Sequence, residues 1–227
     1  MSRKTILRIS ALVSGISGIV ILIGVIYPIV SYNLTYSKNF ELISPIDSTV
    51  KNNVQGIDTT QPSNLDYTQA SNWFVGGAKH EDFANSKVTF YTISIPKLKI
   101  DGATVAIGGE DLTKSLVQYP GTALPGKRGN AVIFGHSILP IFYNPKSYLS
   151  IFSMLPTLHK GDQILVNYDG ISYTYSIEQM FEVLPTDIQV LDQNYDDSYL
   201  TLVTCVPPGD PSNPKRLIIR AKVVPPQ

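Results

Sequence analysis

Residues 200–224 read LTLVTCVPPGDPSNPKRLIIRAKVV, and this stretch decides the fold. Two apolar, β-branched runs, at 200–204 and 217–224, flank a loop that contains several prolines and a glycine. Runs of this kind predict two strands that can pair with each other. Cys205, the only cysteine in the chain, follows the first run directly, and Arg216 precedes the second. We therefore expect a thiol at a strand end and a guanidinium on the neighbouring strand.

Strand geometry leaves two questions about this pair open. Because side chains alternate between the faces of a strand, Cys205 shares a face with Thr201 and Val203. Arg216 shares a face with Arg220 in the same way, so spacing alone does not choose between the two arginines. Cys205 could also be a small buried hydrophobic residue, as free cysteines often are. A nucleophilic cysteine would need a base or a cation beside it to form the thiolate.

Three histidines could supply that base. His80 lies in a polar stretch outside any expected core, and His159 lies in a turn that precedes a strand. His136 follows the apolar run 131–134 and Gly135, at a strand end, where binding residues are often found. The glycine lets the backbone bend at this point. His136 is therefore the candidate base, although a structural or surface role fits the same pattern.

The sequence from residue 87 onward predicts an all-β domain. Short β-branched and aromatic runs alternate with turns rich in Gly, Pro, Asn and Asp. Many short strands at this spacing favour a β-barrel or a β-sandwich, and about 140 residues suffice for one core. Further strands are expected at 88–95, 103–107, 131–134, 163–168 and 172–177, and a short helix at 146–155.

The N-terminal residues predict one membrane-spanning helix. No charged residue occurs between Arg8 and Lys38, and residues 9–30 form a nearly continuous apolar run. About 20 such residues span the hydrocarbon core of a bilayer. The basic tail at 1–8 places the N-terminus in the cytoplasm and the domain at 87–227 outside the cell. We expect a single-pass plasma-membrane protein. The alternative, a cleaved signal peptide, would need a small-residue cleavage pattern, which does not follow the run.

Residues 31–86 are interpreted as an extracellular linker. From residue 41 onward this stretch is rich in Ser, Thr, Asn, Gln and Asp and shows no sustained period. As a flexible coil, about 46 residues would have an end-to-end distance of roughly 35–40 Å, which would hold the domain away from the bilayer. The apolar pair Trp73-Phe74 predicts a short ordered patch, either packed on the domain surface or covering a groove.

Composition excludes several classes of site and partner. Lys and Arg together number 18 and so do Asp and Glu, so no basic field suggests nucleic acid. A single cysteine excludes an internal disulfide and a cysteine-rich zinc site. We expect no metal and no organic cofactor.

Five segments of the chain together resemble sortases, the cysteine transpeptidases of the Gram-positive type of cell surface. TLVTC and RLIIR resemble the family's T-L-x-T-C and R-L-x-[VI]-R elements, and three upstream segments resemble its I-P-K-L, P-G-T-A-L-P-G and G-N-x-x-I-x-G-H elements. The similarity extends over about residues 90–224, with the elements in the family's order. The five segments lie at 94–98, 119–126, 129–137, 201–205 and 216–220.

The resemblance implies a closed sortase-type β-barrel of about eight strands with short helices. It also implies roles for three residues: Cys205 as the nucleophile, His136 as the general acid/base and Arg216 as the oxyanion stabiliser. The substrate would be the sorting-signal peptide of a surface protein, of the Leu-Pro-x-Thr-Gly type. An amine on a cell-wall precursor, or a lysine of a pilin-like protein, would accept the acyl group.

Two departures from the family's pattern leave the subclass of sortase open. Tyr119 stands where many relatives have a non-catalytic histidine, and the loop at 206–215 does not match the better-known subfamilies closely. Two alternatives to the transpeptidase also remain. One is a cysteine hydrolase on the same fold, and the other is a membrane-tethered binding module without turnover.

Overall fold

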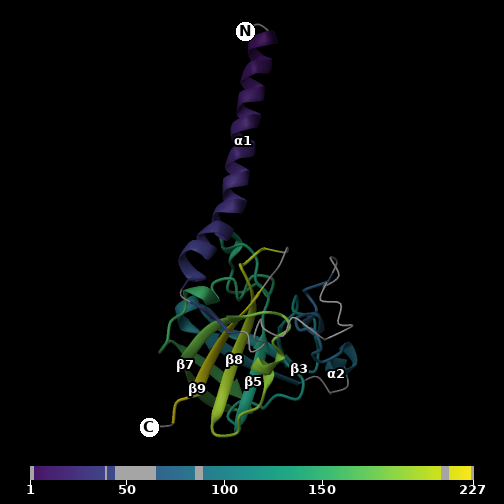
Figure 1. The fold of residues 1–227 in the computed structure, drawn as a ribbon, viewed down its shortest axis with the longest axis vertical. Helices are drawn as coiled ribbons and strands as arrows, with labels where there is room; N and C mark the ends of the chain where they lie inside the picture. The colour runs from purple at the N-terminus through teal and green to yellow at the C-terminus, as the bar shows by residue number, and fades with distance from the viewer. Residues whose placement is uncertain (1–2, 39, 44–64, 85–88, 211–214, 226–227) are drawn as a thin grey trace, which may run out of the picture.

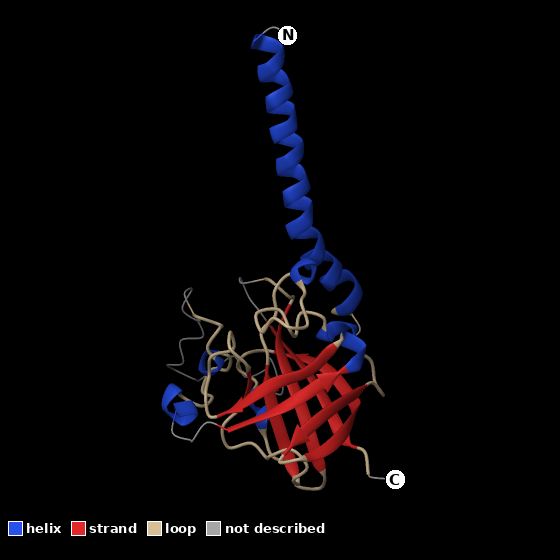
Figure 2. Ribbon diagram, turned by 180° about the vertical axis from the view of Figure 1, so that it is seen from behind, coloured by secondary structure: helices blue, strands red, loops and turns tan. Residues whose placement is uncertain are grey.

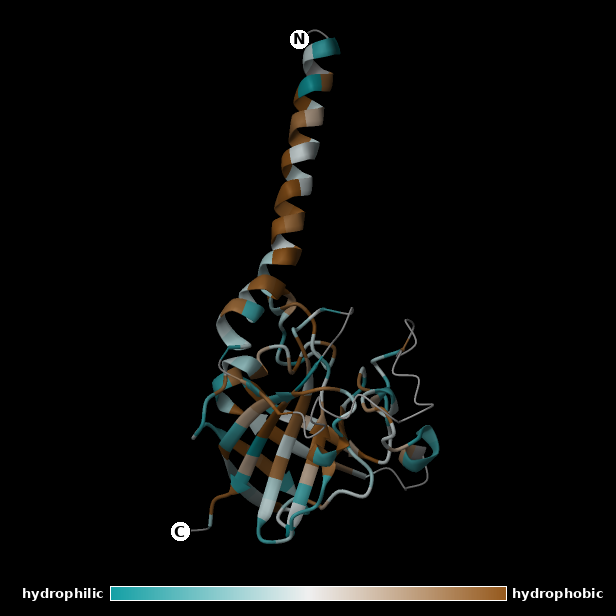
Figure 3. Cartoon of the chain, viewed as in Figure 1, coloured by the Kyte–Doolittle hydropathy of each residue, from teal (hydrophilic) through white to brown (hydrophobic). Residues whose placement is uncertain are grey.

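A computed structural model describes the chain at residues 3–38, 40–43, 65–84, 89–210 and 215–225. Helix α1, Arg3–Ser31, continues into one turn of π-helix at Tyr32–Tyr36. Figure 1 shows α1 standing out from one end of a β-barrel, with the C-terminus at the opposite end. The helix is apolar along most of its length, which suits a segment that projects away from the domain (Figure 3).

Eight strands form the barrel, and a ninth, short strand is added outside it (Figure 2). The order within the sheet is β1-β7-β6-β2-β3-β4-β5-β8-β9, and pairing of β7 with β9 closes the barrel. The strands are β1 Glu41–Leu42, β2 Thr89–Ile95, β3 Ile100–Ile107, β4 Leu116–Gln118, β5 Gly129–Phe134, β6 Gln163–Tyr168, β7 Ile171–Val183, β8 Ser198–Val206 and β9 Lys215–Val223. The expected all-β class and the closed barrel of about eight strands are both confirmed.

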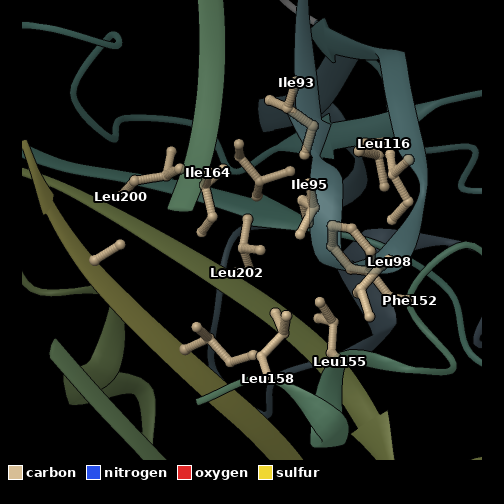
Figure 4. Packing of buried hydrophobic residues seen from close by; sticks show 14 of the residues in the cluster. Ile93, Ile95, Leu98, Leu116, Phe152, Leu155, Leu158, Ile164, Leu200 and Leu202 are labelled. Carbon is tan, nitrogen blue, oxygen red and sulfur yellow. The ribbon is translucent and has the colours of Figure 1, made fainter. Parts of the chain in front are cut away.

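The barrel interior is filled by one face of each strand. Leu200 and Leu202 of β8 point inward and meet Ile93 and Ile95 of β2 and Ile164 of β6 (Figure 4). Aromatic and leucine side chains from the connection between β5 and β6 close one end of this cluster. Because strand side chains alternate, the residues between these positions on β8 face outward. That outward set contains Cys205.

A second apolar cluster lies on the outer face of the barrel wall. Val203 and Cys205 of β8 and Ile218 of β9 belong to it. Residues 65–84, which include helix α2 at His80–Ala84, pack over these strands. They contribute Trp73, which has an exposed fraction of 0%. We call residues 65–84 the covering segment. Trp73-Phe74 therefore packs on the domain surface, above the strands that carry the candidate site.

The structure differs from the sequence expectation at several elements. The helix expected at 146–155 is wrong: that stretch forms consecutive turns before a 3-10 turn at Leu155–Thr157. Its serines explain the difference, because Ser150 Oγ and Ser153 Oγ accept hydrogen bonds from loop backbone N–H groups at 3.0 and 2.9 Å. Strand β4 was not expected, since three residues are too few for a period, and β7 continues past 177 through a bulge.

Residues just after α1 are attached to the barrel, in contrast to the flexible spacer expected for the linker. Tyr32 is buried, and its hydroxyl donates a 2.6 Å hydrogen bond to Glu182 on β7. The other oxygen of Glu182 pairs with Lys215 Nζ at 2.7 Å. Strand β1 also pairs with β7. The barrel therefore begins directly at the end of α1 rather than roughly 35–40 Å away. The central part of the expected linker, 44–64, lies outside the described residues.

Candidate active site

The thiol and the first arginine lie opposite each other across two paired strands. In the antiparallel β8–β9 register, Cys205 is the partner of Arg216. Directly opposed residues project to the same face, with Cβ atoms about 4.5–5.5 Å apart. The proline-rich sequence between them thus returns the chain so that thiol and guanidinium share the outer face. The pairing expected from the two sequence runs is present.

Strand β5 brings His136 to the other side of Cys205. It runs parallel to β8, and its last residue, Phe134, is paired with Val203. Two hydrogen bonds continue this alignment: Gly135 N donates to Val203 O at 3.1 Å, and Ser137 Oγ donates to Cys205 O at 2.7 Å. Two residues beyond Phe134, His136 is therefore level with the cysteine and on the same face.

Packing explains why a glycine precedes this histidine. A Cβ atom at Gly135 would overlap the ring of Phe152 and lie 2.6 Å from Leu116 Cδ2, both in the barrel interior. Position 135, directly after β5, faces the barrel interior, and a Cβ atom has no room there. Because glycine has no side chain, the backbone can lie directly against the packed core at this position. The next side chain, that of His136, then lies on the outer face.

The covering segment encloses Arg216. The side chain is fully buried, and its Nε donates a 2.9 Å hydrogen bond to the backbone carbonyl of Trp73. The guanidinium carbon lies 5.4 Å from the ring centroid of Tyr67 and 5.5 Å from that of Trp73. Cation–π attraction of this kind is stronger where water is excluded. The arginine is therefore held in one orientation by the strand beneath it and the segment above it.

Arg220 has a different environment from Arg216. It is paired with Thr201, four residues before the cysteine on β8. Its Nη2 donates to Val190 O at 3.2 Å, and its Nε lies 3.5 Å from Thr201 Oγ1. Thr201 in turn donates to Asn130 Oδ1 at 2.7 Å. These contacts form a structural network in the barrel wall, so the register resolves which arginine accompanies the thiol.

Burial shifts both titrating groups of the site toward their neutral forms. It raises the pKa of the Cys205 thiol, and the nearby Arg216 guanidinium opposes part of this rise. Burial lowers the pKa of His136, and the carboxylate of Asp66 opposes part of that fall. At neutral pH the site therefore holds a protonated thiol and a neutral imidazole. Within the described part of the chain, His136 Nδ1 is a buried atom with no hydrogen-bond partner.

The loops that follow Cys205 and His136 pack tightly on each other. Gly209 has a φ of +82°, and a Cβ atom there would lie 2.7 Å from both N and Cγ of Leu139. Only glycine combines that backbone angle with so close an approach. The two loops are thereby fixed relative to each other at this end of the barrel.

The other two histidines are exposed, one in an ion pair and the other in a hydrogen bond. His80 begins α2 and pairs with Glu110, while His159 lies 3.0 Å from Lys97 Nζ. Of the three histidines, His136 is the one that the strand register aligns with the cysteine.

Sequence reasoning did not identify the residues of the covering segment that contact the site. Asp66 acts on His136 through its charge, and Tyr67 and Trp73 flank the guanidinium. The one available signal was the apolar pair at 73–74 in an otherwise polar stretch. Contacts between segments so far apart in the sequence have no local pattern, so their partners could not be named in advance.

The arrangement combines three chemical capacities on one face. A thiol can become a nucleophile, a neutral imidazole can accept its proton, and a guanidinium that never deprotonates can stabilise an oxyanion. The enclosing wall is apolar, so an interaction between these groups is stronger than it would be in water. Together they suit acyl transfer from a carbonyl substrate.

Comparison with known proteins agrees with this geometry. The model of the Sortase family, described as the sortase domain, matches residues 93–224. Sortase A of Streptococcus agalactiae serotype III (strain NEM316) is 26% identical over 132 residues, which are 58% of this chain and 51% of that protein. Sortase A of Bacillus anthracis is 27% identical over 172 residues, 70% of this chain and 76% of that protein.

A solved structure supports the same relationship. The Clostridium perfringens Sortase D5 transpeptidase superposes with a TM-score of 0.51 at 28% identity, covering 60% of this chain and 79% of that one. The chain spans about half the length of the Streptococcus agalactiae relative.

Proposed function

The chain belongs to the sortase family, whose members are cysteine transpeptidases that act on surface proteins, and from this membership we propose a specific activity for it. The protein cleaves a sorting-signal peptide of the Leu-Pro-x-Thr-Gly type through a thioester on Cys205. It then transfers the acyl group to an amine on a cell-wall precursor or on another surface protein.

One observation carries this proposal: Cys205 is paired with Arg216 on β9 and is level with His136 after β5. The three side chains come from separate parts of the chain and reach the same outer face of the barrel. The guanidinium is fixed by its bond to the Trp73 carbonyl. A preorganised donor of this kind in a dry site contributes about 3–4 kcal/mol to stabilisation of the transition state.

In the first half-reaction, His136 accepts the thiol proton as the sulfur of Cys205 attacks the scissile carbonyl carbon. A C–S bond forms, and the negative charge that develops on the carbonyl oxygen meets the guanidinium of Arg216. The tetrahedral intermediate then collapses, the C–N bond breaks, and the imidazolium gives its proton to the departing amine. A thioester remains on the enzyme.

In the second half-reaction, the acceptor amine attacks the thioester carbon. His136 takes the proton that the attacking nitrogen must lose, and the new C–N bond forms as the C–S bond breaks. The imidazolium then returns a proton to the sulfur, which restores the neutral thiol and neutral imidazole of the resting site. Proton balance therefore closes over one cycle without any group outside the three residues.

The proposed location is the plasma membrane. One described helix, α1, is long and apolar enough to cross a bilayer. Arg3, Lys4 and Arg8 precede its apolar run, and the positive-inside rule assigns such a tail to the cytoplasm. The catalytic domain then lies outside the cell, where surface proteins bearing sorting signals and amine acceptors are found.

Intact-mass spectrometry of the full-length chain in nanodiscs tests the activity. Wild type, Cys205→Ala and His136→Ala are incubated with a mixture of sorting-type peptides, and a small amine such as triglycine is then added. We expect a peptide-sized thioester adduct on wild type, its conversion to an amide product by the amine, no adduct on Cys205→Ala and almost none on His136→Ala.

Two outcomes would replace this proposal with the alternatives. Release of free acid at the same rate with and without amine would make the protein a hydrolase. If no peptide in the mixture forms an adduct and the thiol is also inert to small alkylating reagents when the protein is folded, the protein is a binding module with a buried cysteine.

A further inference from the structure

An apolar pocket lies between the end of α1 and the loop that follows the candidate base. Its volume is about 400 Å³, and its walls come from the helix, from the π-helical turn, from the β5–β6 connection and from the loop after Cys205. The helix contributes Ile23, Tyr27 and Pro28, and the two barrel loops contribute Ile141 and Pro208. The pocket thus joins the apolar helix to the end of the barrel that carries the site.

The β5–β6 connection presents two large apolar side chains to the outside. Ile141 is 70% exposed and Phe142 is 63% exposed, in a 3-10 turn at Pro140–Phe142. The backbone of this turn is held in place, because the next residue, Tyr143, donates a 2.6 Å hydrogen bond from its hydroxyl to Leu98 O. Adjacent exposed apolar side chains on a fixed loop mark an interaction site.

The position of this turn along α1 indicates what it contacts. Ile23 and Ile141 line the same pocket, and Ile23 lies seven residues before Val30, the last residue of the apolar run. At 1.5 Å per residue, that is roughly 10 Å inside the run. Tyr27, which is 68% exposed, occupies the level at which aromatic residues gather at membrane interfaces. The turn therefore shares a pocket with the C-terminal part of the apolar run, which the proposed topology places in the outer leaflet.

The barrel end that faces α1 is also the end that carries the site. Strands β5 and β8 are parallel, so His136, just after β5, and Cys205, near the end of β8, lie at the same end of the barrel. The pocket includes Pro208 from the loop that follows β8. Figures 1 and 2 show the loops of this end around the foot of α1 and the C-terminus at the far end. Any surface that holds this end also positions the site.

We propose that the Pro140–Phe142 turn is a second membrane contact, in which Ile141 and Phe142 insert into the outer leaflet and lipid acyl chains fill the pocket beside α1. Lipid is the expected occupant because one wall of the pocket is the apolar helix α1 itself, so the pocket is continuous with the surface that the bilayer would cover. The inference rests on the proposed membrane anchoring by α1. It adds that the barrel lies on the bilayer with its catalytic end toward the lipid, so the substrate peptide bond is cleaved close to the membrane surface.

Site-directed spin labelling of the full-length chain in phosphatidylglycerol–phosphatidylcholine vesicles tests this contact. In a Cys205→Ala background, single cysteines are placed at Ile141 and Phe142 and labelled, and accessibility to oxygen and to a water-soluble nickel chelate is measured. Ile171 and Tyr195 provide matched controls at the far end of the barrel, with exposed fractions of 54% and 63%. A label at Ile26 in α1 provides the membrane reference.

We expect the labels at 141 and 142 to resemble the one at 26, with high access for oxygen and low access for the nickel chelate, while 171 and 195 remain accessible to both. Equal nickel access at 141, 142, 171 and 195 would overturn the contact while a protected label at 26 preserved the anchor. Exclusion of both reagents from 141 and 142 would also overturn it, because the turn would then be buried against protein. Access of the nickel chelate to the label at 26 would show that α1 does not span the bilayer, and would overturn both the proposed anchoring and this inference.

Discussion

The backbone carbonyl of Trp73 accepts a 2.9 Å hydrogen bond from Arg216 Nε, across 143 positions of sequence. The indole ring of Trp73 also stacks on Phe134 with centroids 5.1 Å apart, and Phe134 precedes the Gly135-His136 pair. One residue of the covering segment thus contacts the strands that present both partners of Cys205. Because Arg216 is fully buried, the proposed role as oxyanion stabiliser requires the covering segment to shift before a substrate oxygen reaches the guanidinium.

Trp73→Ala should make the thiol more reactive. Loss of this fully buried ring costs about 3–5 kcal/mol of packing and loosens the covering segment. Burial is the main reason that the pKa of Cys205 is raised, so its pKa should fall as water enters. We expect alkylation of Cys205 by iodoacetamide at pH 7 to accelerate severalfold.

Phe83→Ala is the matched control for this variant. Phe83 is also buried in the covering segment, but its ring packs on Tyr119, whereas the rings beside the Arg216 guanidinium are those of Tyr67 and Trp73. Its effect on alkylation should be smaller than that of Trp73→Ala. Equal acceleration by both variants, with the barrel still folded by circular dichroism, would mean that general loosening rather than the Trp73 contact controls the thiol.

Arg216→Lys and Arg220→Lys should have opposite consequences. Lysine cannot reproduce the planar, preorganised donors at Arg216, and loss of one oxyanion donor lowers kcat by about 10²–10³-fold. Arg220 bonds to Val190 O in the barrel wall, so its replacement should lower the free energy of unfolding by about 1–3 kcal/mol with activity largely retained. Steady-state kinetics and urea unfolding of both variants measure the two effects. An active Arg216→Lys beside a folded but inactive Arg220→Lys would reverse the assignment.

Asp66→Asn should move the acid limb of the kcat/KM profile to lower pH. The reaction requires neutral His136, whose pKa burial lowers and the Asp66 charge raises. Removal of that charge lowers the pKa further, so the neutral imidazole persists to a lower pH. The asparagine can keep the hydrogen bonds that Asp66 Oδ1 accepts from Thr68 N and Oγ1, at 2.9 and 2.6 Å.

Asp111→Asn is the control for the charge effect. Asp111 accepts the same pair of hydrogen bonds from Thr113, at 3.0 and 2.6 Å, and is not among the groups that shift the pKa of His136. Its acid limb should stay at the wild-type position. An unchanged limb in Asp66→Asn would show that another group governs the acid side of the profile.

Gly135→Ala should destabilise the barrel and displace His136 together. The added methyl group would overlap Phe152 and approach Leu116, and overpacking of this kind costs about 1–3 kcal/mol. Activity should fall by more than the loss of folded protein explains, because the next residue is the proposed base. In Gly135→Ala with Phe152→Leu, the smaller side chain makes room, so both stability and activity should partly recover. A double-mutant cycle in which the two changes are simply additive would contradict direct overlap.

The strands and the candidate site residues could be predicted from the sequence because the features that indicate them are local. The runs around Leu200 and Leu217 are apolar and β-branched, and turn residues separate them, so strands and their shared loop could be predicted. The expected helix at 146–155 failed because serine side chains there accept hydrogen bonds from backbone N–H groups outside the segment, at Ile138 and Asn144. Strand β4 was missed because a three-residue strand exists only through its neighbours β3 and β5.

The sequence by itself determined the all-β class, the apolar N-terminal helix and the candidate residues Cys205, His136 and Arg216. These depend on β-branched runs and turn residues, on hydrophobic length and on a resemblance carried by contiguous segments, all of which are local properties. Only the tertiary structure decided that Arg216, not Arg220, opposes the thiol, since that depends on the register between β8 and β9. The tertiary structure alone also brought Asp66, Tyr67 and Trp73 over the site, because packing between distant segments is selected by shape and burial and leaves no periodic trace in either segment.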